Sequence, residues 1–535
     1  MNKIFLISVT FCTILFACNN NRNRYDGKAR AFKADTSITR ANACNSLFLD
    51  SNALDNFIIK DTLNDTIANL LRAFYYDRNF EFAWFAPDGI TEQGREFWNL
   101  YTYSVSSLKD SSFFLKALNK RMPDITEQES MNISQGDEHI IRTELMLTEA
   151  FMKYMTGNGK ETDAGELMKY VPAKKEEVMQ LANKILHGTD GTQNEDARRA
   201  FNLLKTKLNT YYNIAKNGGW QTIPYIRKKL KQGMHAPEVV AIKKRLLLTG
   251  ELQGKDTSAV FDNLLDSAVK SFQLSTGYTP DGIVTDSLVS IMNIPAEKRV
   301  EQILINLTRM RWMPEYPSGR LIVTNIPEYE LHVYENRQKA FNMDVVVGKQ
   351  GAGTVVFTGN LTEIVFSPYW NIPPSIVKKE IVPKMDEDKN YLERENMEIT
   401  GESNGLPIVR QLPGPKNALG RVKFLFHNSY NIYFHDTPAK ELFNRDKRAY
   451  SHGCIRLADP VKMAEYLLND NEKWTPDKIT EAMNSGKEKY VTLKDAVPVI
   501  ITYYTAWVDE SGRLNFREDI YGHDASAAEK MFTNP

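Results

Sequence analysis

Net charge is absent from this sequence, because 67 lysines and arginines balance 67 aspartates and glutamates over its 535 residues. A balanced chain has no global field, so the composition does not favour a nucleic-acid-binding protein or one held on a membrane surface by charge. The apolar run Ile4–Ala17 is shorter than the about 20 residues that cross a bilayer as a helix. With 42% hydrophobic and 25% charged residues, the chain is typical of a soluble globular protein, and its length predicts two to four domains.

Cysteine is scarce, with four residues in the whole chain: Cys12, Cys18, Cys44 and Cys454. Lys3 followed by an apolar run has the layout of an export signal, and Leu15-Phe16-Ala17-Cys18 resembles a bacterial lipobox. We therefore expect residues 1–17 to be a lipoprotein signal peptide and Cys18 to carry the acyl chains that anchor the protein to a membrane. An ordinary cleaved signal, with Cys18 incidental, is the alternative.

The first half of the mature chain is predicted to be helical. Residues 18–46 are rich in Asn, Arg, Asp and Thr and are expected to form a flexible tether. Apolar residues recur at helical spacing over residues 47–231, which predicts a helical scaffold domain. Aromatic residues gather between positions 74 and 86 of this domain. We interpret them as packed core, with a ligand site as the alternative.

Residues 232–293 are predicted to form a small unit of three short helices. Phe272-Gln273, Gly277 and Asp281-Gly282-Ile283-Val284 resemble the three-helix peptidoglycan-binding module of many cell-wall enzymes. A purely structural helical insert is the alternative. Residues 294–319 follow as a connecting amphipathic helix that ends at prolines.

After Arg320 the apolar period changes from 3.6 to 2, which predicts a mostly-β domain, a sandwich or small barrel, over residues 320–520. Predicted strands include those around 329–334, 341–347, 364–366, 422–426, 432–434 and 499–508. Asp459 and Pro460 predict the start of a helix. The alternation is lost within residues 371–420. A long insertion in a compact β domain is often a lid or binding loop, and we expect this one to cap the domain. Residues 521–535 are expected to be a C-terminal tail.

Cys454 follows His435 by nineteen positions and is the only cysteine of the C-terminal half. A thiol near its free pKa is only slightly ionised at neutral pH, so it needs a neighbouring base or cation to become a nucleophile. Strand alternation places Tyr433 and His435 on one face, and it does the same for Cys454 and Arg456 if that segment is extended. We expect His435 to act as the base to Cys454 and then to protonate the leaving amine.

The neighbours of this pair have candidate roles of their own. Asp436, through its carbonyl or its side chain, would orient the imidazole. Gly453 allows a tight turn, and the N–H groups of Gly453 and Cys454 are candidate oxyanion donors. The planar fork of Arg456 suits a substrate carboxylate, although pairing with a local carboxylate is the alternative. The other candidate substrate-binding residues are Tyr433, Ser451 and His452.

His435, a spacer of fifteen residues and Ser451-His452-Gly453-Cys454 resemble the signature of the YkuD-type L,D-transpeptidase family. The segments 366–376, 417–424 and 435–438 resemble its large YcbB-like branch, and so does the order of scaffold domain, peptidoglycan-binding module and catalytic domain with capping insertion. The resemblance implies that Cys454 attacks a peptidoglycan tetrapeptide stem between its third residue, a diamino acid, and its fourth, D-alanine. D-Alanine leaves, and the side-chain amine of a neighbouring stem captures the acyl-enzyme as a 3→3 cross-link.

The same resemblance implies no metal or other cofactor, carbapenem acylation of the same cysteine, a role in cell-wall organisation and cell shape, and a periplasmic location in the cell envelope. An L,D-carboxypeptidase or D-amino-acid exchange enzyme using the same acyl-enzyme is an alternative, as is a wall-binding scaffold without catalysis. His452 is more consistent with a structural hydrogen bond than with the base. A zinc site from His427, His435, His452 and Cys454 lacks the usual ligand spacing, and a Cys44–Cys454 disulfide is conceivable in an oxidising compartment.

Overall fold

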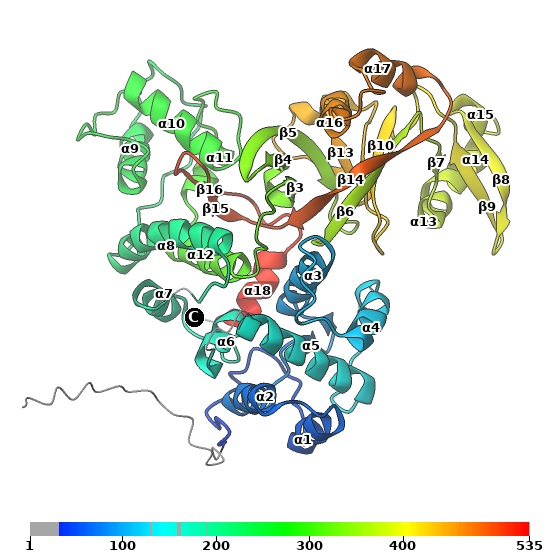
Figure 1. The fold of residues 1–535 in the computed structure, drawn as a ribbon. Coiled ribbons are helices and arrows are strands. Elements are labelled where there is room, and N and C mark those ends of the chain that lie inside the picture. The colour runs from blue at the N-terminus through cyan, green and yellow to red at the C-terminus, as the bar shows by residue number, and fades with distance from the viewer. Residues whose placement is uncertain (1–31, 129–130, 158–161, 190, 534–535) are drawn as a thin grey trace, which may run out of the picture.

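The structure is a computed structural model that describes residues 32–128, 131–157, 162–189 and 191–533. The expected signal peptide, residues 1–17, and Cys18 lie outside these ranges. Helices come first and a mostly-β region follows, as the sequence predicts (Figure 1). Within the described ranges, no helix combines the length and apolarity needed to cross a membrane.

In the described part of the chain, eight α-helices and one short hairpin precede the small module. The helices are α1 (Ser51–Lys60), α2 (Asp65–Asp77), α3 (Glu92–Ser106), α4 (Lys116–Thr126), α5 (Glu138–Thr156), α6 (Ala164–Tyr170), α7 (Val178–His187) and α8 (Glu195–Lys216), and the hairpin pairs β1 (Phe85–Ala86) with β2 (Gly89–Ile90). Phe74, Tyr75, Trp84 and Phe85 are fully buried in one core with Trp312. The prediction that these aromatic residues form packed core is therefore confirmed.

Three further helices form the small module: α9 (Glu238–Thr249), α10 (Asn263–Ser275) and α11 (Asp286–Met292). Their apolar faces share a separate core, to which residues 223–230 also contribute, upstream of the expected boundary at 232. The next helix, α12 (Ala296–Met310), packs on α7 and α8 in a third core. It corresponds to the predicted connecting helix.

Nine strands that follow Arg320 form one sheet in the order β12-β5-β13-β11-β10-β6-β14-β3-β4. Because β4 also pairs with β5, the sheet closes into a barrel with an apolar interior. The strands are β3 (Arg320–Asn325), β4 (Glu330–Glu335), β5 (Gln338–Gly348), β6 (Thr358–Phe366), β10 (Val422–Phe426), β11 (Phe434–His435), β12 (Ala449–Ser451), β13 (Ile455–Leu457) and β14 (Lys489–Thr502). The mostly-β region that the change of apolar period predicts after Arg320 is confirmed.

Local sequence explains several of these elements. Asn336 and Arg337 both have positive φ, which gives β4 and β5 the two-residue turn that matches strand twist. Asp459 caps α16 (Pro460–Leu468) by accepting the Lys462 N–H at 3.0 Å, as predicted. Helix α16 and α17 (Pro476–Asn484) contribute apolar side chains to the barrel core.

The insertion between β6 and β10 is a separate subdomain with its own small core, which we call the cap. Its three-stranded sheet has the order β7-β9-β8, and it lies at the far right of the molecule in Figure 1. The cap elements are β7 (Trp370–Asn371), α13 (Pro374–Ile376), η3 (Val377–Ile381), α14 (Val382–Glu387), α15 (Tyr391–Arg394), β8 (Met397–Ser403) and β9 (Leu406–Gln411).

Three expectations about the ends of domains need correction. The tether ends earlier than residue 46, because Ile38 and Ala43 are buried and the Cys44 N–H donates to Ala173 O at 3.3 Å. The strand predicted over 499–508 is interrupted: β14 ends at Thr502, and β15 (Ala506–Val508) pairs with β16 (Leu514–Phe516) beside α8. The expected tail contains α18 (His523–Met531), which packs on α12 and is visible in red at the centre of Figure 1.

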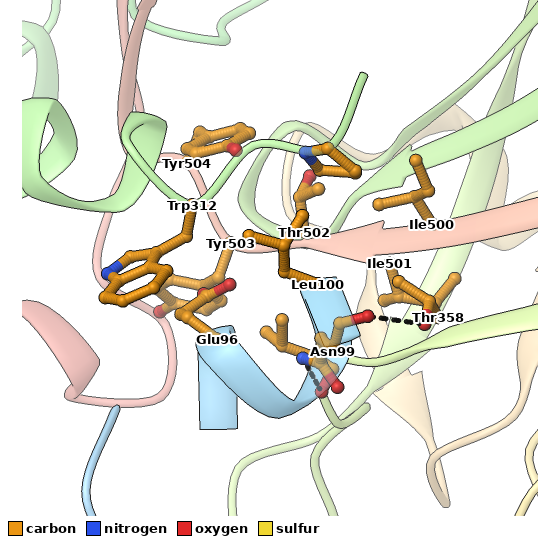
Figure 2. Close-up of a pocket in the computed structure, with 12 residues that line it drawn as sticks. Glu96, Asn99, Leu100, Trp312, Thr358, Ile500, Ile501, Thr502, Tyr503 and Tyr504 are labelled. Carbon is orange, nitrogen blue, oxygen red and sulfur yellow. Dashed lines mark hydrogen bonds between the residues drawn. The ribbon is translucent and has the colours of Figure 1, made fainter. Parts of the chain in front are cut away.

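A small cavity lies where α3 of the scaffold meets the end of β14 (Figure 2). Glu96 lines it and has no ion pair among the residues described. Burial, together with the nearby Glu92 carboxylate, raises the pKa of Glu96 to about 8. Glu92 itself pairs with Arg309 at 2.5 Å. The interface between scaffold and barrel therefore contains a carboxyl group that is protonated at neutral pH.

Replacing Glu96 tests this assignment. Unfolding lets the side chain lose its proton near pH 4.5, whereas the folded protein holds it until about pH 8, so Glu96 lowers the free energy of unfolding as pH rises between these values. Glu96→Gln should therefore melt at a higher temperature than wild type at pH 8, and the gain should vanish near pH 4.5, as measured by calorimetry. Glu92→Gln, which loses the Arg309 pair, should melt lower. A Glu96→Gln variant no more stable than wild type at pH 8 would contradict the raised pKa.

Candidate active site

The site is built on the pairing of two short strands. Strand β11 runs parallel to β13, with Phe434 opposite Ile455 and His435 opposite Arg456. Phe434 and Ile455 point into the barrel core. Since side chains alternate along a strand, the residues beside them project from the outer face. That face carries Tyr433, His435, Cys454 and Arg456.

Cys454 is partly exposed, and its Sγ–H donates to Asn431 O over 3.6 Å. Burial raises the pKa of its thiol to about 11, and contacts with Tyr433 and the Arg456 charge offset only part of this effect. Burial and the same sulfur also raise the pKa of the Tyr433 hydroxyl. Cys454 is therefore a thiol, rather than a thiolate, at neutral pH.

His435 is 4% exposed, and its Nδ1 lies 2.5 Å from Asp436 O. A carbonyl oxygen only accepts, so Nδ1 carries the proton and Nε2 has the free lone pair that a base needs. Burial lowers the pKa of His435 to about 3, and the Arg456 charge acts in the same direction. The imidazole is therefore a neutral base.

The thiol and the imidazole share a face, but no hydrogen bond joins them in the part of the chain that the structure describes. The Cys454 thiol donates to Asn431 O instead. Catalytic hydrogen bonds often form only when substrate is bound, so this geometry describes a resting site. Rotation of the cysteine side chain would be needed to bring its proton to Nε2.

Asp436 orients the imidazole through its main-chain carbonyl, which decides between the two possibilities left by the sequence. Its carboxylate has other partners: the Arg421 N–H at 2.9 Å, the Thr437 N–H at 2.7 Å and Lys440 Nζ at 2.8 Å. Gly420 has a φ of +62°, and a side chain there would collide with the Asp436 carboxylate. This network fixes the turn that follows His435.

The loop before Cys454 differs from the predicted arrangement. Gly453 has a φ of +110°, as a tight turn requires, but its N–H donates to Ser451 Oγ at 3.2 Å. Ser451 is 2% exposed, and its hydroxyl donates to Cys454 O at 2.5 Å. Ser451 therefore braces the loop instead of facing a substrate, which corrects its predicted role. Only the Cys454 N–H, of the two expected oxyanion donors, is without a partner among the residues that the structure describes.

Arg456 offers an unpaired cation at the site. Its Nε is buried without a hydrogen-bond partner, and no ion pair is found for its guanidinium within the described chain. Burial lowers its pKa, and the Cys454 sulfur and Glu441 act against this shift. Glu441 is the carboxylate whose charge acts on the pKa of Arg456, yet the two side chains form no ion pair. The local pairing considered as the alternative is therefore not formed among the residues that the structure describes.

His452 lies outside this face and contacts the cap. Its Nε2 is 2.8 Å from Glu380 Oε1 of η3 and 3.4 Å from Lys349 Nζ. The interaction with Glu380 fits a structural hydrogen bond between the cap and the catalytic loop, and it leaves His435 as the candidate base.

The residues considered for zinc do not come together as ligands. One group of His, Cys, Asp and Glu side chains in the described ranges is close enough to hold a metal ion, and it consists of Glu328, Glu330 and His332. His427 is exposed on the segment after β10. Cys44 and Cys454 are both free thiols in the structure, so the conceivable disulfide is not formed.

Two residues near the site were missed in the sequence. Thr354 Oγ1 donates to Gly453 O at 2.8 Å and so fixes the loop from the segment between β5 and β6. Lys423 lies directly across from His435 in the sheet and pairs weakly with Glu488 at 3.8 Å. The alternation over 422–426 could have placed Lys423 on the polar face, but no local pattern indicates Thr354.

The small module touches the loop that leads to Cys454. The Thr279 N–H and Oγ1 donate to Asp446 Oδ1 at 3.1 and 2.7 Å. Gly277 has positive φ and sits against Arg517, where a side chain would collide. The positive φ alone favours glycine at this position, and the Thr279–Asp446 contact ties the module to the loop.

Comparison with known proteins identifies three regions of the chain. Residues 319–501 match the YkuD family, described as the L,D-transpeptidase catalytic domain; residues 69–215 match a scaffold domain; and residues 235–292 match a domain described as "Putative peptidoglycan binding domain". A Haemophilus influenzae protein named "Putative L,D-transpeptidase" is 32% identical over 252 residues, which are 44% of this chain and 50% of that protein. The match thus spans half the length of this relative.

Solved structures with similar regions include two L,D-transpeptidases. The protein from Stackebrandtia nassauensis has 14% identity and a TM-score of 0.21, with 52% of this chain and 95% of that chain covered. The protein from Xylanimonas cellulosilytica has 13% identity and a TM-score of 0.17, with 52% of this chain and 99% of that chain covered. At these scores the structural likeness carries no argument about activity.

The pH dependence of cysteine alkylation tests the thiol assignment. Iodoacetamide reacts with the thiolate, and burial holds the pKa of Cys454 at about 11. The alkylation rate should therefore rise about tenfold per pH unit from pH 7 to pH 10. A Cys44→Ala background isolates the signal by mass spectrometry. A rate that is already constant above neutral pH would instead show a preformed thiolate paired with an imidazolium.

Proposed function

We propose that this chain, whose residues 319–501 form a YkuD-type L,D-transpeptidase catalytic domain, cross-links peptidoglycan stems through an acyl-enzyme on Cys454. The observation that carries the proposal is the outer face of β11 and β13, which presents a base, a thiol and an unpaired cation together. The peptidoglycan-binding and scaffold domains that match elsewhere in the chain support a wall polymer as substrate.

In the first half-reaction, the Cys454 sulfur attacks the carbonyl carbon between the third residue and D-alanine of a tetrapeptide stem. His435 Nε2 takes the thiol proton as the S–C bond forms, so a buried thiolate does not have to exist beforehand. The Cys454 N–H donates to the oxyanion of the tetrahedral intermediate. When the C–N bond breaks, His435 gives the proton to the departing amine. D-Alanine is released, and the rest of the stem stays bound to Cys454 as a thioester.

In the second half-reaction, the neutral side-chain amine of another stem attacks the thioester carbonyl. The amine gives a proton to His435, the C–S bond breaks, and the sulfur recovers the proton as a thiol. The product is an amide between two third residues, the 3→3 cross-link. Water in place of the amine would give hydrolysis, which is the carboxypeptidase outcome of the same acyl-enzyme.

A location in the cell envelope follows from peptidoglycan-related domains, because the substrate lies there. We further propose the periplasm and an N-terminal lipid anchor at Cys18, on the lipobox-like sequence alone. We also propose residues 320–520 as the catalytic region, with the cap at 371–420.

Mass spectrometry of the intact protein tests the acyl-enzyme. Wild type mixed with a tetrapeptide stem should gain the mass of the stem minus D-alanine, on Cys454. Cys454→Ala should gain nothing, whereas the control Cys44→Ala should acylate normally, because burial raises the pKa of Cys44 to about 12. An adduct that persists in Cys454→Ala would overturn the assignment. The released product then separates the two fates: a dimer indicates transpeptidation and a tripeptide indicates hydrolysis.

A thermodynamic cycle that combines an Arg456 variant with a modified substrate tests the role of Arg456. A charge-assisted hydrogen bond contributes about 1.5–3 kcal/mol, so Arg456→Gln should lower kcat/KM for the tetrapeptide by roughly 10- to 100-fold. With a stem whose diamino acid has its free carboxylate amidated, kcat/KM of the wild type should fall by a similar factor, and kcat/KM of the variant should barely change. Equal losses in both enzymes would show that Arg456 does not bind that carboxylate.

A further inference from the structure

The segment between α8 and α9 lies on the surface of the small module, with some side chains exposed and others buried. We call residues 221–232 the strap. Ile223, Ile226 and Leu230 are buried and turn into the core of the module. The strap is thus part of this module, although it precedes the 235–292 match.

The strap is held in place by main-chain contacts along its length. The Ile223 N–H donates to Asn293 Oδ1 at 2.8 Å, and the Asn293 amide donates back to Ile223 O at 2.9 Å. The Ile226 N–H donates to Asp286 Oδ1 at 3.2 Å. Leu230 pairs with Val284 in both directions, at 3.0 and 2.8 Å. A backbone fixed at three points presents its outward side chains in a constant arrangement, which lowers the entropic cost of binding.

The exposed side chains of the strap include one aromatic ring and four cations. Tyr225 is 75% exposed, more than any other large hydrophobic residue described. Arg227, Lys228, Lys229 and Lys231 are exposed, and none forms a side-chain hydrogen bond or ion pair with a residue that the structure describes. No acidic residue occurs between positions 219 and 237. In a chain whose total charge is balanced, the strap is a local run of positive charge whose side chains form no ion pair with a described residue.

We propose that the strap is a peptidoglycan-binding surface, with the Tyr225 ring against a sugar and the cations on the carboxylates of stem peptides. Charge complementarity supports this ligand, since stem peptides carry free carboxylates that exposed guanidinium and ammonium groups bind. Continuity with the peptidoglycan-binding match supports it as well. A membrane surface fits less well, because the other apolar residues of the strap are in the module core, which leaves one ring to insert.

This inference rests on the proposed function only for the choice of polymer. Its role is retention on the wall, separate from the chemistry at Cys454. Binding and acylation can therefore be measured independently in the full-length protein.

Co-sedimentation with purified peptidoglycan sacculi tests the proposal. The variant Arg227→Gln/Lys228→Gln/Lys229→Gln should bind about tenfold more weakly at low salt, and its binding should depend less on salt, because exposed charges are screened. Tyr225→Ala should weaken binding without changing its salt dependence. The control variant Lys473→Gln/Lys478→Gln/Lys487→Gln removes three exposed lysines near α17 and should bind like wild type.

Two further measurements make the result unambiguous. Acylation by a soluble tetrapeptide and the melting temperature should be unchanged in the strap variants, so lost binding cannot come from misfolding or from a damaged site. Wild-type binding by the strap variants would overturn the proposal. So would a loss confined to anionic phosphatidylglycerol vesicles, since the strap would then contact a membrane. Failed acylation in wild type, with strap-dependent binding intact, would remove the proposed function alone.

Discussion

The parallel pairing of β11 with β13 is the constraint on which the site depends. Cys454 and His435 are nineteen positions apart in the chain, and the ladder returns them to neighbouring strands. Its register is set by Phe434 and Ile455, which both enter the barrel core. A shift of one residue would turn the thiol inward and expose apolar side chains, so the burial that stabilises the barrel also determines where the nucleophile points.

Burial then sets the chemical state of the pair. Desolvation disfavours charge, so it raises the thiol pKa and lowers the imidazole pKa, and both groups rest in their neutral forms. Arg456 adds an unpaired positive charge that favours a thiolate and opposes an imidazolium. The surrounding domains contact the same loop: the cap reaches it through Glu380 and His452, and the small module reaches it through Thr279 and Asp446. Charge develops at the sulfur only as its proton leaves.

Much of this site was predictable, because its information is local. Period-2 alternation indicated the strands around 330–347, and it placed Tyr433 and His435 on one face before any pairing was known. Local sequence did not predict interactions whose partners are set by the tertiary structure. Whether the Gly453 N–H is free depends on the rotation of Ser451 Oγ. Helix α18 is held by an ion pair between Asp524 and Arg309 at 2.5 Å, and these two residues are distant in the sequence. The short, alanine-rich segment after Gly522 has little apolar periodicity, so its burial against α12 could not be read from sequence.

The protonation state of His435 tests the central claim most directly. NMR of the protein with labelled imidazole rings, assigned with His435→Gln, would follow the ring nitrogens between pH 4.5 and 9. The account predicts a neutral ring with its proton on Nδ1 over the whole range, because burial lowers its pKa to about 3 and Asp436 O accepts that proton. A ring that titrates near or above the ordinary value for histidine, and is therefore an imidazolium beside a thiolate in the resting enzyme, would contradict it.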